Sequence, residues 1–496
     1  MKTNVESDEH NTIETKVDTI EESLLPESKS IWKVPLFKAK SLNTILLCLP
    51  VFINGFCSSM YGPTLPQLAR NCGVSSDDIG WIFAARASVL FTALIVGYVL
   101  DHYKKKEARL CELCSKTIIT IGLIFMSFST FMIPWISSLV LITLNNAVLA
   151  IGQNMTGLAG NVSLVWIWKD RVDPAMQLYY ACYGLGSILA PLAYSAVDSV
   201  LFAMYGQTKE IEPGIFDKKL TVTVTFIGLG ILGTITTILC LFIRFRNIIE
   251  YNLTQEAAVE LKDIPLDVVD VDPIEDNSEQ VVVVPEQSSD LEKIKVDQNK
   301  KERIRNVLIT IITGLALMIY VAAEYGFGSL LYLYVVDKKR LTDEKSGAIM
   351  NSAFWFFFTV GRVIAIPTSL FLSGAQMLII AMIGGFLSST ALVFLKNSIV
   401  CVWIFSILFG LSLSSQYPTT ITLPRTYMGV VMSGSMTSIV VLAGQIGAVL
   451  GPFLITQSTK ISNNDDSFIY TVFGASAVAS ILYIVLLVFF KRTKTA

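Results

Sequence analysis

Three fully charged side chains lie in the middle of long apolar stretches of this sequence: Arg86, Glu324 and Arg362. An ionised group in the hydrocarbon of a membrane costs about 2.5–3.5 kcal/mol on insertion, so it persists where it is paired or where it faces a wet cavity. Glu324 and Arg362 fall on neighbouring stretches and can pair with each other. Three roles remain open for such charges: a static brace between helices, a gate or proton-titrating element, or direct contact with a solute.

Carboxamide side chains recur at a helical spacing in the stretch 138–164. Asn146 and Gln153 are seven residues apart, and so are Asn154 and Asn161. Seven residues make nearly two helical turns, so each pair shares a face. Amides both donate and accept hydrogen bonds, which suits a neutral polyhydroxy solute. The alternative is that these amides bond one helix to another.

Six further side chains in apolar stretches are candidates for contact with a solute. Aromatic rings among them could stack on a sugar, although aromatic residues in membrane spans more often pack against each other. The six are Asn54, Tyr320, Asn351, Trp355, Gln416 and Gln445.

The sequence motifs give little indication of an enzyme or of a metal site. The sequence has no phosphate-binding loop, which argues against an ATP-driven pump, and its only histidines are His10 and His102. Cys111 and Cys114 have the spacing of a redox or metal pair but lack a second pair nearby. We therefore expect a protein that is not an enzyme, with no catalytic residues, no bound metal and no nucleic-acid partner.

The elements that must position these side chains are membrane helices. Hydrophobic residues make up 53% of the 496 residues and charged residues only 16%, against about 25% charge in soluble domains. A helix needs about 20 apolar residues to span a bilayer. The sequence predicts twelve spans, at 43–66, 78–100, 116–134, 138–164, 175–203, 221–243, 306–334, 347–371, 374–394, 398–423, 429–455 and 468–490.

The distribution of charge predicts the domains and the orientation. We expect an acidic tail at 1–41, a six-helix bundle at 42–245, an acidic linker at 246–304, a second bundle at 305–490 and a basic tail at 491–496. Lysine and arginine concentrate in loops that are cytoplasmic if both termini are inside. Lys338, Lys339, Arg340 and Lys345 run against this orientation.

The two halves of the sequence echo each other at similar offsets. Gly186 precedes Pro191 by five residues in the fifth span, and Gly447 precedes Pro452 by five in the eleventh. An arginine recurs in the same way, as Arg86 in the second span and Arg362 in the eighth. A glycine recurs as Gly152 in the fourth span and Gly410 in the tenth. The sequence thus predicts an all-α membrane protein with two pseudo-symmetric bundles and a solute site between them.

The end of the second span carries a recognisable pattern. Gly97 is followed four residues later by Asp101 and then by a basic run that includes Lys105. This segment resembles the signature loop between the second and third helices of the major facilitator superfamily, although His102 and Lys104 depart from its usual residues. The resemblance implies that two six-helix bundles rock about a solute site in alternating access.

Further segments resemble the sodium-dependent glucose transporter group (major facilitator domain-containing protein 4) and the related fucose permease type. They lie around Asn161, from Tyr320 to Gly328, and from Ser352 to Arg362. The resemblance implies a sugar-like solute. It also shows departures, because Gly62 and Gly157 occupy places where relatives carry acids that couple transport to a cation.

The resulting expectation is a transporter or facilitator for a small polar solute, foremost a hexose, in a monomeric protein embedded in lipid. Coupling to Na⁺ or H⁺ is in question because of Gly62 and Gly157, and facilitated diffusion through the protein is the alternative. Other solutes (an amino acid, an organic anion or a vitamin) and a non-transporting receptor or scaffold remain as further readings. We expect the plasma membrane, while the segment 21–25 resembles a dileucine signal for endolysosomal sorting.

Overall fold

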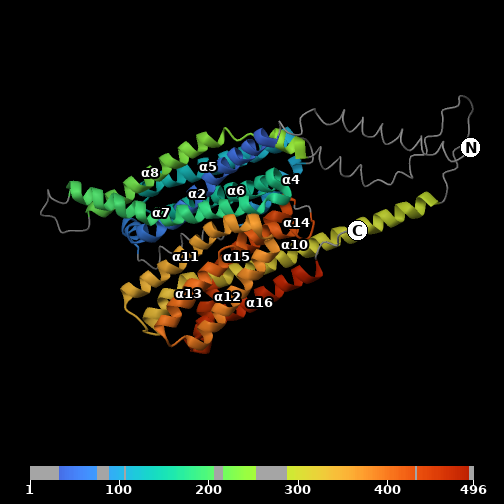
Figure 1. Ribbon diagram of the computed structural model, residues 1–496. Coiled ribbons are helices and arrows are strands. Elements are labelled where there is room, and N and C mark those ends of the chain that lie inside the picture. Colours follow the sequence, from blue (N-terminus) through green and yellow to red (C-terminus); the bar gives the residue numbers. More distant parts are fainter. Residues whose placement is uncertain are drawn as a thin grey trace, which may run out of the picture.

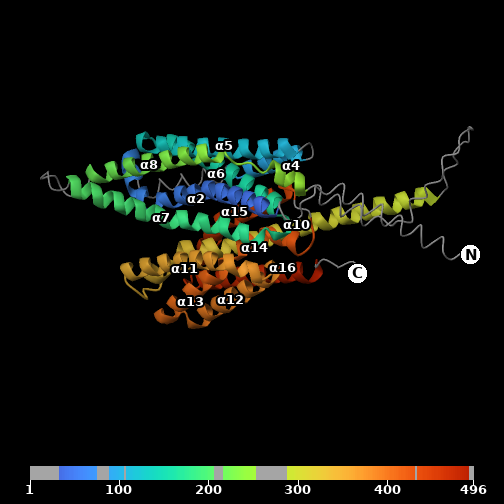
Figure 2. The ribbon, with the colours of Figure 1, turned by 45° about the horizontal axis from the view of Figure 1, so that its top comes forward.

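A computed structural model describes residues 33–74, 89–104, 108–205, 216–252, 287–430 and 433–490. Arg86, Lys105 and most of the two tails and the linker lie outside these ranges. The described chain is almost entirely helical. Figure 1 and Figure 2 show two neighbouring bundles, one coloured blue to green and the other yellow to red.

The N-terminal bundle consists of helices separated by short connections. They are α2 (Lys33–Cys72), α4 (Thr92–Lys104), α5 (Ala108–Met132), α6 (Leu139–Trp168), α7 (Asp173–Tyr205) and α8 (Phe216–Cys240), with short 3₁₀ turns η2 (Ile133–Trp135) and η3 (Lys169–Arg171). Helix α2 therefore begins within the segment 1–41 that we expected as a tail.

The C-terminal bundle follows the same plan. Its helices are α10 (Gln287–Leu333), α11 (Glu344–Phe371), α12 (Gly374–Leu395), α13 (Ile399–Leu413), α14 (Gln416–Thr426), α15 (Gly434–Ser462) and α16 (Ser467–Phe489), and a π-turn η5 (Tyr334–Lys338) follows α10. The N-terminal part of α10 projects out of one end of the bundle (Figure 1). The end of the molecule at which α10 enters the bundle is called the α10 end below, and the opposite end is the far end.

Within the described ranges, eleven helices are long and apolar enough to cross a membrane. They correspond to all the predicted spans except the second, whose residues 78–88 lie outside the description. Side chains such as Phe371, Phe394 and Val488 are largely exposed on the outer faces of the helices, which is the pattern expected where helices face lipid rather than water.

The echo between the halves has a structural basis in glycine packing. A Cβ atom on Gly186 of α7 would lie 2.1 Å from the carbonyl oxygen of Phe52 on α2, and one on Gly447 of α15 would lie 2.1 Å from that of Met318 on α10. Both glycines thus bring two helix backbones into direct contact. The equivalent crossings, α2 with α7 and α10 with α15, form the centres of the two bundles.

The predicted tenth span differs from expectation because it is broken into α13 and α14 at Ser414 and Ser415. Pro418 explains the break, since proline has no N–H to donate to the carbonyl four residues earlier. The carbonyl of Ser414 is therefore available to a side chain, and it accepts a hydrogen bond from Arg362 Nε at 3.4 Å.

Candidate functional site

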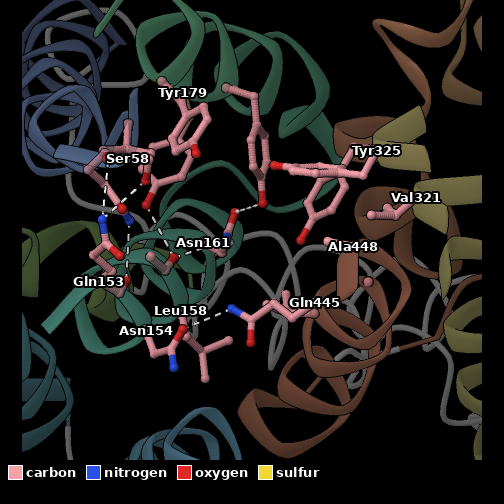
Figure 3. Close-up of a pocket in the computed structure, with 18 of the residues that line it drawn as sticks. Ser58, Gln153, Asn154, Leu158, Asn161, Tyr179, Val321, Tyr325, Gln445 and Ala448 are labelled. Carbon is pink, nitrogen blue, oxygen red and sulfur yellow. Dashed lines mark hydrogen bonds between the residues drawn. The ribbon is translucent and has the colours of Figure 1, made fainter. Parts of the chain in front are cut away.

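A cavity of about 220 Å³ lies where the two bundles face each other. It is bounded by α2, α6 and α7 on one side and by α10, α11, α14 and α15 on the other (Figure 3). Its lining residues are Val51, Asn54, Ser58, Gln153, Asn154, Gly157, Leu158, Asn161, Tyr179, Tyr180, Tyr183, Val321, Glu324, Tyr325, Arg362, Tyr417, Val441, Gly444, Gln445 and Ala448. Seven of the polar residues singled out in the sequence are among them.

The carboxamides of α6 and α2 hold one wall of the cavity. Asn54 Nδ2 donates to the carbonyl of Gln153 at 3.3 Å, and Gln153 Nε2 donates to Ser58 Oγ at 3.2 Å. Asn161 Nδ2 donates to the carbonyl of Gly157 at 2.9 Å. These bonds fix the orientation of each amide, and all three residues line the cavity. The two predicted roles, hydrogen bonding within the bundle and cavity lining, therefore fall on the same residues.

One amide pair joins the two bundles directly. Gln445 Nε2 on α15 donates to Asn154 Oδ1 on α6 at 2.9 Å (Figure 3). Asn154 Nδ2 in turn donates to Thr92 Oγ1 at 3.0 Å. The Oε1 atom of Gln445 is buried and has no hydrogen-bond partner in the described structure, so it can accept from a ligand.

Tyrosines complete the cavity and were not among our predicted site residues. Tyr179, Tyr180 and Tyr183 come from α7, Tyr325 from α10 and Tyr417 from α14. The hydroxyl of Tyr180 donates to Asn161 Oδ1 at 3.1 Å, and its ring meets that of Tyr417 edge-on with centroids 4.9 Å apart. The sequence offered one local signal for them, because Tyr325 directly follows Glu324.

Glu324 and Arg362 both reach the cavity and both are buried, with 2% and 6% of their surface exposed. They do not form an ion pair: Arg362 donates to the carbonyls of Ser414 and Tyr180, each at 3.4 Å, and its guanidinium lies 4.4 Å from the ring centroid of Phe358. The bond to Tyr180 crosses between the bundles. Arg362 therefore acts here as a bridge, while Glu324 Oε2 has no hydrogen-bond partner.

The bundles are joined below the cavity, at the α10 end, by the predicted signature segment. Asp101 at the end of α4 accepts hydrogen bonds from the backbone N–H groups of Gly434 and of Ser435, the latter at 2.7 Å. These are the first amides of α15, so the carboxylate caps a helix of the opposite bundle and neutralises its positive end. A Cβ atom on Gly97 would lie 2.5 Å from Ser438 Oγ, which explains the need for glycine there.

A second contact closes the same end. Gln177 Nε2 on α7 donates to Thr419 Oγ1 on α14 at 3.0 Å, with both side chains buried. These contacts and the Arg362–Tyr180 bond all lie at or below the level of the cavity. At the α10 end the two bundles are therefore held together by hydrogen bonds between buried or half-buried groups.

Comparison with known proteins agrees with this architecture. Residues 47–452 match the Major Facilitator Superfamily. The chain belongs to this superfamily.

Curated members of the superfamily resemble the chain over most of its length. The sodium-dependent glucose transporter 1 of Xenopus laevis is 22% identical over 434 residues, which cover 86% of this chain and 77% of the relative. Major facilitator superfamily domain-containing protein 4A of Xenopus tropicalis is 23% identical over 481 residues, or 91% and 93% of the two chains. The crystal structure of the major facilitator superfamily transporter FucP in the outward conformation superposes with a TM-score of 0.62 at 15% identity, covering 92% of this chain and all of that one.

The other predicted site residues of this major facilitator protein lie outside the cavity. The hydroxyl of Tyr320 donates to the carbonyl of Leu413 at 2.8 Å, and Tyr320 and Gln416 instead face a smaller pocket inside the C-terminal bundle. Trp355 packs behind Tyr325, with ring centroids 5.9 Å apart, so it supports a cavity residue without lining the cavity. Asn351 lies one helical turn earlier on α11 and does not line the cavity either.

Two glycines noted as replacements for acids have different positions. Gly157 is part of the cavity wall, and a Cβ atom there would meet only Asn54 Nδ2, at 3.8 Å. Gly62 lies further along α2 than the cavity residues Asn54 and Ser58. The wall of α6 therefore has room at Gly157 for a ligand.

Proposed function

We propose that this major facilitator protein moves a hexose across a membrane by alternating access, with the hexose bound in the cavity between the bundles. The observation that carries the proposal is the composition of that cavity. It presents fixed amides from both bundles, tyrosine hydroxyls and an unpartnered amide oxygen on Gln445. A polyhydroxy solute can donate to and accept from such groups, and tyrosine rings offer flat faces to a sugar.

The relatives support the choice of sugar over other polar solutes. The curated relatives that match most of the chain include one named as a glucose transporter. An anionic solute would need a cation in the cavity, and Arg362 is the cation that lines it in the described structure. Because Arg362 already donates hydrogen bonds to the carbonyls of Ser414 and Tyr180, the contacts favour an anionic solute less.

Orientation forms part of the proposal. We place both termini and the α10 end in the cytoplasm, in agreement with the distribution of lysine and arginine. With that orientation the contacts of Asp101 and Gln177 close the cytoplasmic side, and the cavity faces outward. The two bundles then span 42–245 and 305–490, and the plasma membrane and the monomeric state stay predictions.

Uptake by the purified full-length chain in proteoliposomes tests the proposal. We expect labelled hexose to equilibrate faster than in empty vesicles, and unlabelled hexose on the inside to accelerate entry by exchange. Absence of both for every hexose would refute the substrate. Exchange of an organic anion or an amino acid under the same conditions would favour a carrier for that solute, and no exchange of any solute would favour a receptor or scaffold.

A further inference from the structure

Glu324 is the one acidic side chain that lines the cavity in the described structure. It is 98% buried, and its Oε2 atom has no hydrogen-bond partner. Burial of a charged carboxylate without a partner is strongly unfavourable, and such groups are neutralised by a proton, a cation or a donor. The cavity is the side from which that neutralising group can arrive.

The obvious partner for Glu324 is held elsewhere. Arg362 donates to the carbonyl of Ser414, which Pro418 leaves without its helical donor, and to the carbonyl of Tyr180 across the bundle interface. It also stacks on the ring of Phe358. In this form of the protein the guanidinium is held by two backbone carbonyls and an aromatic ring, and it does not form an ion pair with Glu324.

The bond between Arg362 and Tyr180 exists only while the bundles are closed at the α10 end. Arg362 belongs to α11 of the C-terminal bundle, and Tyr180 belongs to α7 of the N-terminal bundle. When the bundles separate at this end, the guanidinium loses that acceptor but keeps its position within the C-terminal bundle, where Glu324 also lies. The carboxylate is then the nearest group of opposite charge.

The titratable side chains that surround Glu324 are four tyrosines and one arginine. Helix α10 itself supplies Tyr320 and Tyr325, α14 supplies Tyr417 and α16 supplies Tyr483, all of them phenols. Helix α11 supplies the cation Arg362. Helices α13 and α15 carry no charged residue at this level.

We propose that Glu324 is the ion-coupling site of this transporter and that it alternates between a proton, taken up from the cavity in the closed form, and Arg362, which replaces the proton when the α10 end opens. One proton binds to a carboxylate oxygen on one side of the membrane and leaves on the other, so each cycle moves one proton with the solute. This inference rests on the proposed function and assigns its coupling ion.

The surroundings favour a proton over a sodium ion. Hard metal cations take about six or more oxygen ligands in proteins. Glu324 is surrounded by phenol rings, and the hydroxyl proton of Tyr320 is already donated to the carbonyl of Leu413. A proton needs one carboxyl oxygen, whereas sodium would need several further ligands beside a guanidinium that repels it.

The test uses the full-length chain in proteoliposomes with the membrane potential clamped by potassium and valinomycin. A gradient of about one pH unit, acid outside, is applied to wild type, Glu324→Gln, Glu324→Asp and the control Asp465→Asn, which makes the same carboxyl-to-amide change outside the membrane. We expect wild type and Asp465→Asn to accumulate labelled hexose up to about tenfold, since a tenfold ratio of protons corresponds to about 1.4 kcal/mol. Glu324→Asp keeps a carboxyl group and should accumulate hexose to a lower level than wild type. Glu324→Gln should exchange hexose but not accumulate it.

Several results would overturn the inference. Accumulation by Glu324→Gln equal to wild type would show that another group carries the ion. Wild-type exchange without accumulation under the pH gradient would show passive transport, and accumulation driven only by a sodium gradient would assign sodium instead. If wild type exchanges no hexose at all, the proposed function itself fails, and this outcome is recognised before any variant is compared.

Discussion

Amide side chains in the cavity wall are held in place by hydrogen bonds to neighbouring groups. Asn161 shows the arrangement clearly, since its nitrogen is bonded to the carbonyl of Gly157 and its oxygen accepts from Tyr180. A side chain held at both ends cannot rotate away from a solute. Ordered polar groups lose little entropy on binding, which favours specificity.

Replacement of Asn161 by alanine should therefore weaken hexose binding. Loss of one amide and of the hold on Tyr180 removes on the order of 1 kcal/mol, so the apparent Km for exchange should rise roughly fivefold. The matched control is Asn145→Ala on the same helix, because Asn145 donates to the carbonyl of Ser129 away from the cavity. Equal Km values for the two variants would contradict a role of Asn161 in binding.

Alanine at Gly447 should destabilise the C-terminal bundle. Its methyl group would lie 2.1 Å from the carbonyl oxygen of Met318, and overpacking of this kind typically costs about 1–3 kcal/mol. Thermal unfolding of the detergent-solubilised protein should show a lower midpoint than wild type. Gly228→Ala is the control, since a Cβ atom there meets nothing within 4 Å, and a midpoint shift of the same size in both would disprove the packing argument.

Sequence reasoning found the buried charges and amides of the site because polar residues are conspicuous in apolar segments. It also expected Tyr320 and Gln416 to contact the solute. Both lie on the same helices as cavity residues, but they face a pocket inside the C-terminal bundle instead. Spacing along one helix cannot tell which of two polar faces meets the opposite bundle. That choice is made by the packing of neighbouring helices, and the same limit hid the five tyrosines.

Among the elements, α4 and α15 form the contact that most directly controls opening. Asp101 neutralises the N-terminus of α15 from the opposite bundle, and a carboxylate in this position typically contributes about 0.3–2 kcal/mol. The contact is lost whenever the bundles separate at the α10 end. The energy of this one cap therefore biases the balance between the two forms.

Asp101→Asn should shift the protein toward the form that is open at the α10 end. Ser438→Cys, which lies against Gly97 in this contact, should react faster with a membrane-impermeant maleimide from that side when Asp101 is replaced. A loss of 1–2 kcal/mol corresponds to a change of roughly 5–30-fold in the equilibrium. Unchanged labelling would show that Asp101 has no part in closure, and Asp198→Asn, at the far part of α7, serves as the control.

Two of the lysines that run against the predicted orientation form ion pairs at the far end of the molecule. Lys339 and Lys396 contact Asp466 at 2.6 and 2.8 Å, and Lys338 contacts Asp465 at 3.7 Å. Acids of the connection between α15 and α16 thus balance the basic connections beside them. Counting lysine and arginine alone misses this pairing, because the acids lie in a different connection, more than 100 residues after Lys338 and Lys339.

Stability should depend on Asp466 in a defined range of pH. Burial raises the pKa of Asp466, but hydrogen bonds from Lys339 and Lys396 outweigh it, so its pKa lies below the ordinary value. An unfolded Asp has a pKa of about 3.9. Because the folded pKa is the lower one, the stabilisation is fully present above about pH 4 and is lost as the pH falls through the folded pKa.

The unfolding midpoints of wild type and Asp466→Asn should accordingly differ at neutral pH and converge in acid below about pH 4. Asp465→Asn should differ less from wild type, because the Lys338–Asp465 pair is longer and nearly half exposed. A difference between wild type and Asp466→Asn that persists unchanged into acid would mean that the carboxylate is not the source of the effect.

The proposed alternating access requires the two bundles to move as units against each other. Gln177 and Thr419 lie in contact across the interface at the α10 end. With the native cysteines replaced, Gln177→Cys combined with Thr419→Cys should stop hexose exchange when cross-linked and recover it on reduction. Ser115→Cys with Ser163→Cys, a contacting pair inside one bundle, should tolerate the same treatment, and equal inhibition of both pairs would argue against rigid-body rocking.

At this scale the sequence predicted the architecture well. Helices that must satisfy their own backbone in lipid leave long apolar signatures, and the paired glycines Gly186 and Gly447 marked the equivalent crossings in the two halves. The sequence could not predict which end is closed in the structure. Closure depends on contacts between residues hundreds of positions apart, such as Asp101 and Gly434.

The proline-induced interruption between α13 and α14 links backbone geometry to the ionisation of the site. Pro418 has no N–H to give to the carbonyl of Ser414, and this oxygen accepts from Arg362 instead. In an unbroken helix the same oxygen would also accept a backbone N–H, which would weaken its hold on the guanidinium. The interruption of the tenth helix therefore favours the position of Arg362 away from Glu324.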